Sequence, residues 1–126
     1  MKALRIAIAV FVLLMVAGLI NGAYLSAQCR QWSVRLSRAE EATEQGDWNS
    51  AQREMDALKK SWQGAQSYLH ITLQHEEINK ADTLLHQCAL YAETQDGSAF
   101  SDAAVQLTLQ FDRLAEMERL SIKNVL

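Results

Sequence analysis

The sequence contains no proline, and its 126 residues include only five glycines, two cysteines and nine aromatic residues. Proline interrupts helix interiors and is common in loop-rich and all-β chains, so its absence favours long helices. Two cysteines allow at most one disulfide, which excludes a small fold held together by several bridges. β-branched residues are sparse outside the N-terminal segment, and the abundant Ala, Leu, Gln and Glu are good helix formers. The composition therefore predicts an all-α fold.

Acidic side chains outnumber basic ones outside the first residues of the chain. Lys2 and Arg5 are the only charged side chains among residues 1–24, whereas residues 25–126 carry 10 basic and 15 acidic side chains. A domain with this acidic balance lacks the basic surface that nucleic acids require, so we expect no nucleic-acid partner. Anionic lipid headgroups would also repel it weakly.

The one long hydrophobic run lies at the N-terminus. Ile6 to Ile20 is apolar throughout apart from Gly18, and with its extension to Leu25 it spans 20 residues. About 20 helical residues cross the roughly 30 Å hydrocarbon core of a bilayer. The basic Lys2 and Arg5 precede the run, and positive charge is retained on the cytoplasmic side. We therefore predict a single-pass protein of the cell membrane, with residues 1–24 as the anchor and residues 25–126 as an extracytoplasmic domain.

A cleaved signal peptide has the same basic start and apolar core. Cleavage needs small residues at positions −3 and −1, but a cut after Ala23 places Asn21 at −3 and a cut after Ala27 places Leu25 there. A lipoprotein signal needs a small residue before its cysteine, and Gln28 precedes Cys29. The sequence thus favours a retained anchor, with cleavage as the alternative.

Apolar residues recur every three or four positions along the rest of the chain, as in helices that pack together. We expect the first helix to continue out of the membrane and to end at Gly46, and Asp47 to cap the second. Trp32, Trp48 and Trp62 fall in the apolar positions and are predicted core residues. The apolar positions of these two helices are Leu25, Cys29, Trp32, Leu36, Ala39 and Thr43, then Trp48, Ala51, Met55, Leu58, Trp62, Ala65, Leu69 and Leu73.

Two further helices follow, with Asp96-Gly97-Ser98 between them and Ser98 or Ser101 as the expected cap. No glycine or proline marks the boundary near residues 72–75, so the bundle has three or four long helices. Short connections make neighbouring helices antiparallel. The fourth helix should return toward the bilayer and leave a short tail over residues 121–126. The apolar positions of these helices are Ile78, Ala81, Leu85, Cys88 and Ala92, then Phe100, Ala104, Leu107, Phe111, Leu114 and Met117.

Few residues suggest chemistry. His70 and His75 are five positions apart, about 140° around one helix, so they should not converge. His86 and Cys88 diverge likewise, and with no HExxH or CxxC motif we expect no metal and no cofactor. His75, Glu76 and Glu77 could perform general acid–base chemistry, but two acids in a first turn also suit the helix dipole. We expect Cys29 and Cys88 to be buried free thiols at different heights.

Several short motifs together resemble the bacterial domain-of-unknown-function 4363 family over nearly the whole chain. They are Gly46-Asp47-Trp48 with Ala51, Trp62, His75-Glu76-Glu77-Ile78, and Glu118-Arg119-Leu120-Ser121-Ile122 with Asn124 and Leu126. The resemblance implies a small membrane-anchored helical protein of Firmicutes with no assigned activity or cofactor. It also implies a membrane-protein partner, because some family members are encoded beside membrane proteins.

Two functions stay open at this point. We expect a non-enzymatic interaction or structural module, whose partner is a membrane protein or a second copy. Its contacts would come from leftover apolar residues such as Leu84, Leu90, Tyr91 and Leu109. The alternative is an extracytoplasmic sensor or hydrolase-like enzyme centred on His75 and Glu76. The candidate interaction or motif residues are Asp47, Trp48, Trp62, His75, Glu76, Glu77, Arg119 and Asn124.

Overall fold

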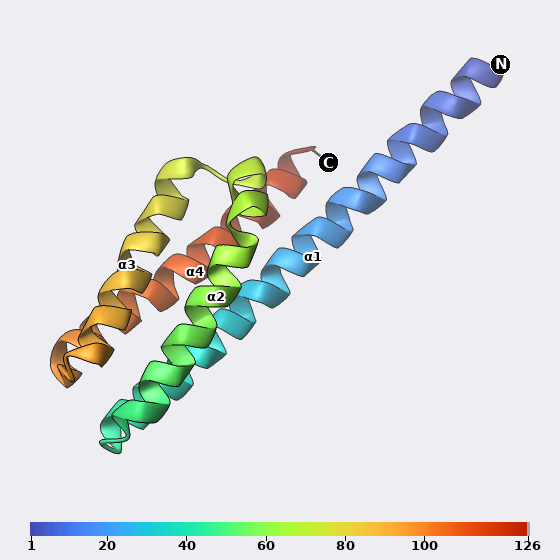
Figure 1. The fold of residues 1–126 in the computed structure, drawn as a ribbon. Coiled ribbons are helices and arrows are strands. Elements are labelled where there is room, and N and C mark those ends of the chain that lie inside the picture. Colours follow the sequence, from blue (N-terminus) through green and yellow to red (C-terminus); the bar gives the residue numbers. More distant parts are fainter. Residues whose placement is uncertain (126) are drawn as a thin grey trace.

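The computed structural model describes residues 1–125, without the side chains of residues 71, 72 and 121–125. Four helices account for almost all of this part of the chain, and it contains no strand. They are α1 (Lys2–Glu44), α2 (Trp48–Thr72), α3 (His75–Glu93) and α4 (Gly97–Val125). Each helix packs against the next along the chain, and α4 packs back against α1 (Figure 1). The predicted all-α bundle is confirmed, and it contains four helices.

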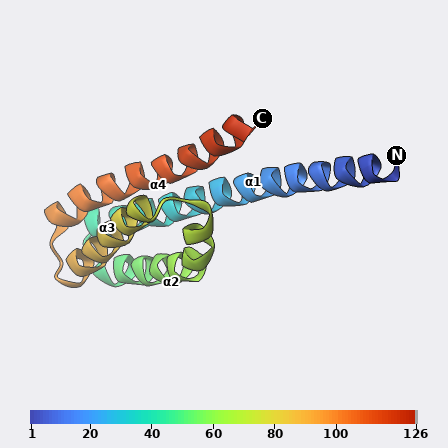
Figure 2. The same ribbon diagram turned by 90° about the horizontal axis from the view of Figure 1, so that it is seen from above.

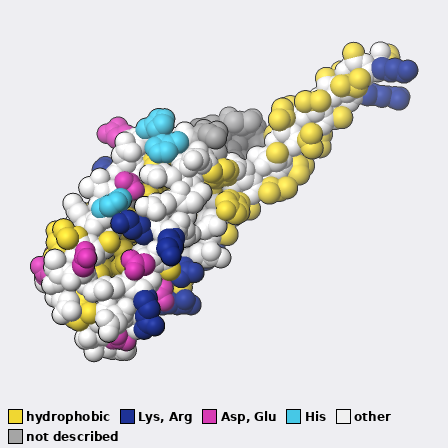
Figure 3. Space-filling model, in the orientation of Figure 1, with side chains coloured by type: hydrophobic (Ala, Val, Ile, Leu, Met, Phe, Trp, Pro, Cys, Tyr) yellow, Lys and Arg dark blue, Asp and Glu magenta, His cyan; other side chains and the backbone are white. Residues whose placement is uncertain are grey.

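The first helix is the longest, and its N-terminal half projects beyond the other three (Figures 1 and 2). Apolar side chains cover this projection, and basic side chains lie at its tip (Figure 3). It is the one helix, among the described residues, that is long and apolar enough to cross a membrane, and none of its apolar stretch is buried. That exposure distinguishes it from the buried core helix of a soluble protein.

Burial along α1 begins at Gly22 and Leu25 and continues at three- or four-residue intervals into the bundle. The heptad-like spacing keeps one stripe of the helix facing its partners. Opposing stripes from the other helices close the core. The largest fully buried side chains are Trp32, Trp62, Phe100, Phe111, Leu25, Leu36, Met55, Leu58, Leu69, Ile78, Leu85 and Leu107.

Two tight turns close the end of the bundle away from the projecting segment. Gly46 has a φ of +75°, the left-handed conformation that glycine adopts without steric cost. Asp47 then caps α2 by accepting a hydrogen bond from the backbone N–H of Ser50. At the second turn, Asp96 caps α4 through the N–H of Ala99. The prediction of Ser98 or Ser101 as this cap is therefore wrong.

The boundary between α2 and α3 is a true break. Leu73 is extended, with φ −127° and ψ 167°, and Gln74 is also extended before α3 begins. The two segments are thus separate helices. The predicted tail after residue 120 is wrong, because α4 continues to Val125.

Candidate functional site

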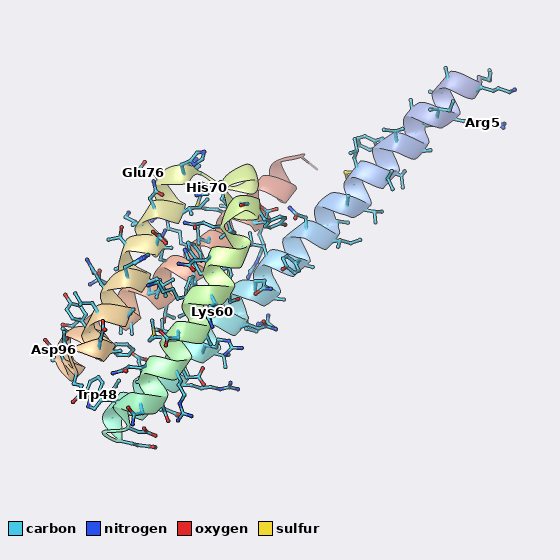
Figure 4. The ribbon with its side chains drawn as sticks, viewed as in Figure 1. Arg5, Trp48, Lys60, His70, Glu76 and Asp96 are labelled. Carbon is cyan, nitrogen blue, oxygen red and sulfur yellow. The ribbon has the colours of Figure 1, made fainter. Side chains whose placement is uncertain are left out.

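The structure does not bring the candidate residues together in one place. Asp47 and Trp48 lie at the end with the two tight turns, Trp62 lies in the middle of the core, and His75, Glu76 and Glu77 begin α3 at the opposite end. Figure 4 shows this separation through its labelled Trp48 and Glu76. Arg119 is exposed and pairs with Glu116, at 3.7 Å, on its own helix. Asn124 lies outside the described side chains.

At the end with the tight turns, the predicted residues have structural roles. Ser50 donates to Asp47 from both its hydroxyl and its backbone N–H, and these bonds lower the pKa of the Asp47 carboxyl. Trp48 is only half-buried, and its ring lies 3.8 Å from where a Cβ would stand on Gly97. Trp48 therefore joins the α1–α2 turn to the α3–α4 turn, so its prediction as a core residue is wrong.

The other two tryptophans form the centre of the core. Trp32 and Trp62 meet edge-to-face with ring centroids 5.3 Å apart, and Phe111 of α4 lies 5.5 Å and 6.0 Å from them. Each indole N–H also has an acceptor on a neighbouring helix. Trp32 donates to Ser61 at 2.8 Å, and Trp62 donates to Asp82 at 3.0 Å. Both residues therefore hold the helices together, which agrees with their prediction as core residues.

Glu77 connects α3 to α4. Its carboxylate accepts a hydrogen bond from the amide of Gln110 at 2.8 Å, and Arg113 lies 3.4 Å away. The same amide also donates to the backbone carbonyl of Glu77 at 3.0 Å. The Gln110 hydrogen bond, helped by Arg113 and opposed by desolvation, lowers the pKa of Glu77. Glu77 is thus a structural contact between helices.

The prediction that His70 and His75 do not converge is wrong. Their Nδ1 atoms lie 2.7 Å apart, and the rings stack with centroids 4.6 Å apart. The break at Leu73 changes the direction of the chain, so the angle expected along one continuous helix does not apply. A contact between two Nδ1 atoms is a hydrogen bond only when one ring donates a proton and the other accepts it.

This end of α2 also meets α1 and α4 in a polar cluster that sequence reasoning missed. The amide of Asn21 donates to Oε1 of Glu118 at 3.4 Å, and the Tyr68 hydroxyl donates to the Asn21 carbonyl at 3.3 Å. Tyr24 packs edge-to-face on Tyr68 at 5.8 Å. Glu118 is only 6% exposed, and this burial raises its pKa, while the Asn21 hydrogen bond partly opposes the effect. We call Asn21, Tyr24, Tyr68 and Glu118 the basal cluster.

The two cysteines are free and buried. Burial raises the pKa of both Cys29 and Cys88 to about 12. A thiol must ionise before it acts as a nucleophile or a metal ligand, so these two are chemically inert in the folded protein. Among the described residues, moreover, no group of three His, Cys, Asp or Glu side chains is placed to hold a metal ion.

A shallow groove of about 540 Å³ runs between α3 and α4 on the outside of the bundle. Leu84 and Leu109 supply its apolar surface, and the side-chain amides of Asn79, Gln87 and Gln106 line it. Leu109 is 63% exposed, and Val105 of the same helix is also exposed. We call this the α3–α4 groove. It contains two of the four apolar residues predicted to be left over for contacts.

The comparisons with known proteins identify a family. Residues 19–125 match the family model described as Domain of unknown function (DUF4363). The chain belongs to this family. No curated protein and no solved structure matches it. The matched range begins at Leu19, within the last part of the projecting segment of α1. It therefore includes Asn21 of the basal cluster.

The family motifs have structural roles in this chain. Asp47 caps a helix, Trp48 joins two turns, and Trp62 lies in the core. Glu77 binds α4, and Glu118 binds α1. These five residues therefore maintain the bundle and its attachment to the projecting helix.

Proposed function

We propose that this protein is a single-pass membrane protein whose helical bundle is a non-enzymatic binding module for another membrane-anchored chain. One observation carries the proposal: the exposed apolar half of α1 and its buried half form a single helix without a break. A helix of this kind fixes the height and direction of the bundle at the bilayer. A partner at the same height would meet the bundle in a defined orientation, which favours a membrane partner over a diffusible substrate.

The basal cluster supports retention of the N-terminal segment. Cleavage after Ala23 would remove Asn21, the hydrogen-bond donor to Glu118. Cleavage after Ala27 would also remove Leu25, a core residue that is 1% exposed. Either cut would open the end of the bundle, so we infer that the mature protein keeps its anchor.

The charges at the tip of α1 support the orientation. Lys2 and Arg5 precede the apolar stretch, and such charges remain on the cytoplasmic side. The bundle then lies outside the cytoplasm, and its basal cluster lies near the membrane surface. Tyr24 is 52% exposed at this level, where the amphipathic tyrosine ring is favoured.

The binding role is preferred to catalysis because the two buried carboxylates with shifted pKa values are engaged in contacts between helices. Glu77 and Glu118 both contact neighbouring helices. Among the described side chains, the polar contact of His75 is with His70 rather than with Glu76. The outer face offers instead the α3–α4 groove with its exposed leucine.

Crosslinking in intact membranes tests the proposal. The full chain, expressed at its native level, should be captured after crosslinking together with one reproducible membrane-anchored chain. A matched control fuses residues 1–24 to an unrelated domain, and it should capture nothing specific. Recovery of the uncrosslinked monomer alone would contradict the proposed function.

A further inference from the structure

The outer face of α1 carries a row of arginines just above the membrane-spanning segment. They lie in a shallow groove of about 330 Å³ that is lined by Arg30, Gln31, Val34, Arg35 and Arg38. Arg35 forms an ion pair with Glu54 of α2 at 3.7 Å, so Arg35 and the adjacent Gln31 mark the edge of the groove toward α2. Among the described side chains, no ion pair joins Arg30 or Arg38 to an acid, and residues 25–39 contain no acid. The groove therefore has positive charge that is not neutralised within the bundle.

The same face of α1 continues downward into the membrane-spanning segment. Because each helical residue turns by about 100°, Ala23, Ala27 and Val34 lie within about 40° of one another, on the side opposite the buried stripe of the helix. Arg30 and Arg38 stand about 40° to either side of Val34. All five residues are exposed. We call Ala23, Ala27, Arg30, Val34 and Arg38 the α1 seam.

The apolar part of the α1 seam suits a second helix that runs alongside. Ala23 and Ala27 are small residues four positions apart, a pattern that lets membrane helices approach closely. Val34, which is 45% exposed, follows seven positions after Ala27. Spacings of four and seven residues are those of a contact line between two packed helices. Since α1 passes from the projecting segment into the bundle as one helix, the line continues across the membrane surface (Figure 2).

The height of the two unpaired arginines indicates what can pair with them. Arg30 lies five residues and Arg38 thirteen residues beyond Leu25, or about 8 Å and about 20 Å above the end of the apolar segment. The headgroup layer adds only about 5–8 Å to each side of the hydrocarbon core. A lipid headgroup therefore reaches Arg30 but not Arg38. Beyond Arg38 the sign of the charge reverses, because residues 40–44 carry three glutamates.

We propose that the α1 seam binds the membrane-spanning helix of a different chain, which continues out of the bilayer alongside α1 and places carboxylates opposite Arg30 and Arg38. This inference rests on the proposed function, and it names the contact surface and the chemistry of the partner. The two arginines are about 12 Å apart along α1. The partner's acids therefore lie seven or eight residues apart on one face of its helix.

Charge complementarity selects this occupant over a second copy. A two-fold contact brings the same surface of both chains together, so two parallel seams would place Arg30 opposite Arg30 and Arg38 opposite Arg38. Such a contact would join like charges, which opposes association. The α3–α4 groove selects no partner by charge, because Glu76 and Lys80 both line it.

Photo-crosslinking in intact cells tests the occupant. A benzophenone side chain in place of Val34 in the full chain should crosslink to one membrane-anchored chain, within about 15 residues of that chain's membrane-spanning segment. The crosslinked peptide, identified by mass spectrometry, should carry two acids seven or eight positions apart. The control replaces Lys60, an exposed residue of α2, and should not crosslink to this peptide. A crosslink to a second copy, to lipid alone or to a segment without acids would overturn the inference.

Charge reversal tests the role of the arginines. Arg30→Glu and Arg38→Glu should each lower the crosslink yield from position 34 about tenfold, because each places like charges in contact. Lys60→Glu is the matched control and should leave the yield unchanged. Lysine in place of the partner's matching acid should restore the yield of Arg30→Glu. Equal losses for all three variants, or no restoration, would overturn the pairing, and circular dichroism of the purified variants verifies that each is folded.

The position of the crosslinker separates this inference from the proposed function. If a benzophenone at position 34 captures no chain but one in place of Leu109 captures a membrane-anchored chain, the α1 seam is overturned and the binding module is supported. If neither position captures a chain, the α1 seam is again overturned. Recovery of the monomer alone after general crosslinking in membranes would then contradict the proposed function as well.

Discussion

Asn21 and Glu118 are 97 residues apart in the sequence, and the amide of Asn21 donates to the carboxylate of Glu118 at 3.4 Å. The contact joins the last polar position of the apolar segment to the C-terminal part of α4. Tyr68 of α2 adds a third helix by donating to the Asn21 carbonyl. Three helices are therefore connected where the projecting segment enters the bundle. These contacts fix the orientation of the segment relative to the domain.

The stability of the bundle should depend on the protonation of Glu118. Its folded-state pKa is raised, mainly by desolvation, so folding favours the protonated acid. The contribution of protonated Glu118 to the free energy of unfolding is fully present below its unfolded-state pKa of about 4.3. This contribution is lost as the pH rises through the folded-state pKa. Glu118→Gln, which keeps an acceptor for Asn21, should raise the thermal unfolding midpoint at pH 7 and leave it nearly unchanged at pH 4. A lower midpoint at pH 7 would show that the charge itself is stabilising.

Glu77 should have the opposite dependence. Its folded-state pKa is lowered, first by the Gln110 hydrogen bond, so its contribution is present above the unfolded-state pKa and is lost as the pH falls through the folded-state value. Gln110→Leu should destabilise the chain at pH 7, and the difference from the unmodified protein should shrink in acid. Gln63→Leu, at an exposed position on α2, is the control for a polar-to-apolar change. The free energy of unfolding of both variants would be measured from pH 7 into acid. If Gln110→Leu and Gln63→Leu changed it equally at every pH, the role of Glu77 would be refuted.

Trp62 and Trp48 should contribute unequally to stability. Trp62→Ala removes a fully buried side chain and should cost about 3–5 kcal/mol. Trp48→Ala removes a half-buried ring, so its cost should be clearly smaller. Val34→Ala, on an exposed face, should stay within about 0.5 kcal/mol. Chemical denaturation of the full chain in micelles measures all three, and a larger loss for Trp48→Ala than for Trp62→Ala would contradict this account of the core.

Two glycines at the same end of the bundle should respond differently to alanine. Gly46 has a φ of +75°, and an alanine there should cost about 1–2 kcal/mol, because its Cβ is strained in the left-handed conformation. Gly97 is the first residue of α4, and an added Cβ would lie 3.8 Å from Trp48, an ordinary contact distance. Gly97→Ala should therefore be neutral or slightly stabilising. Equal destabilisation by the two variants would contradict the turn assignment.

Local patterns in the sequence predicted most of the fold. Apolar spacing identified the core stripe from Leu25 to Ala39 and the buried Trp32 and Trp62, because one face of each helix must pack. Gly46 and Asp47 marked a helix end and a helix start through their own backbone and side-chain preferences. The weak point was the α2–α3 boundary, where Leu73 is extended without a glycine or proline to indicate it.

Contacts between distant residues could not be predicted from these patterns. His70 and His75 meet because the helix breaks between them, so a calculation for one continuous helix gave the wrong answer. Asp96 replaced the predicted serine caps because the turn places its carboxylate at the N–H of Ala99. The basal cluster depends on where the C-terminal part of α4 meets α1, which local patterns do not reveal. In the sequence, the only indication of this cluster was Asn21, a polar residue in an otherwise apolar segment.

Cysteine accessibility along α1 tests the central claim most directly. Single cysteines at residues 2, 8, 12, 16 and 31 of the full chain would be treated in intact cells with a membrane-impermeant maleimide, with Cys29 and Cys88 replaced by alanine. We predict labelling at position 31 in intact cells, labelling at position 2 only after the membrane is opened, and protection of positions 8, 12 and 16 until detergent is added. Labelling of the three protected positions in intact cells, or a mature chain that begins after residue 23, would contradict the continuous membrane helix.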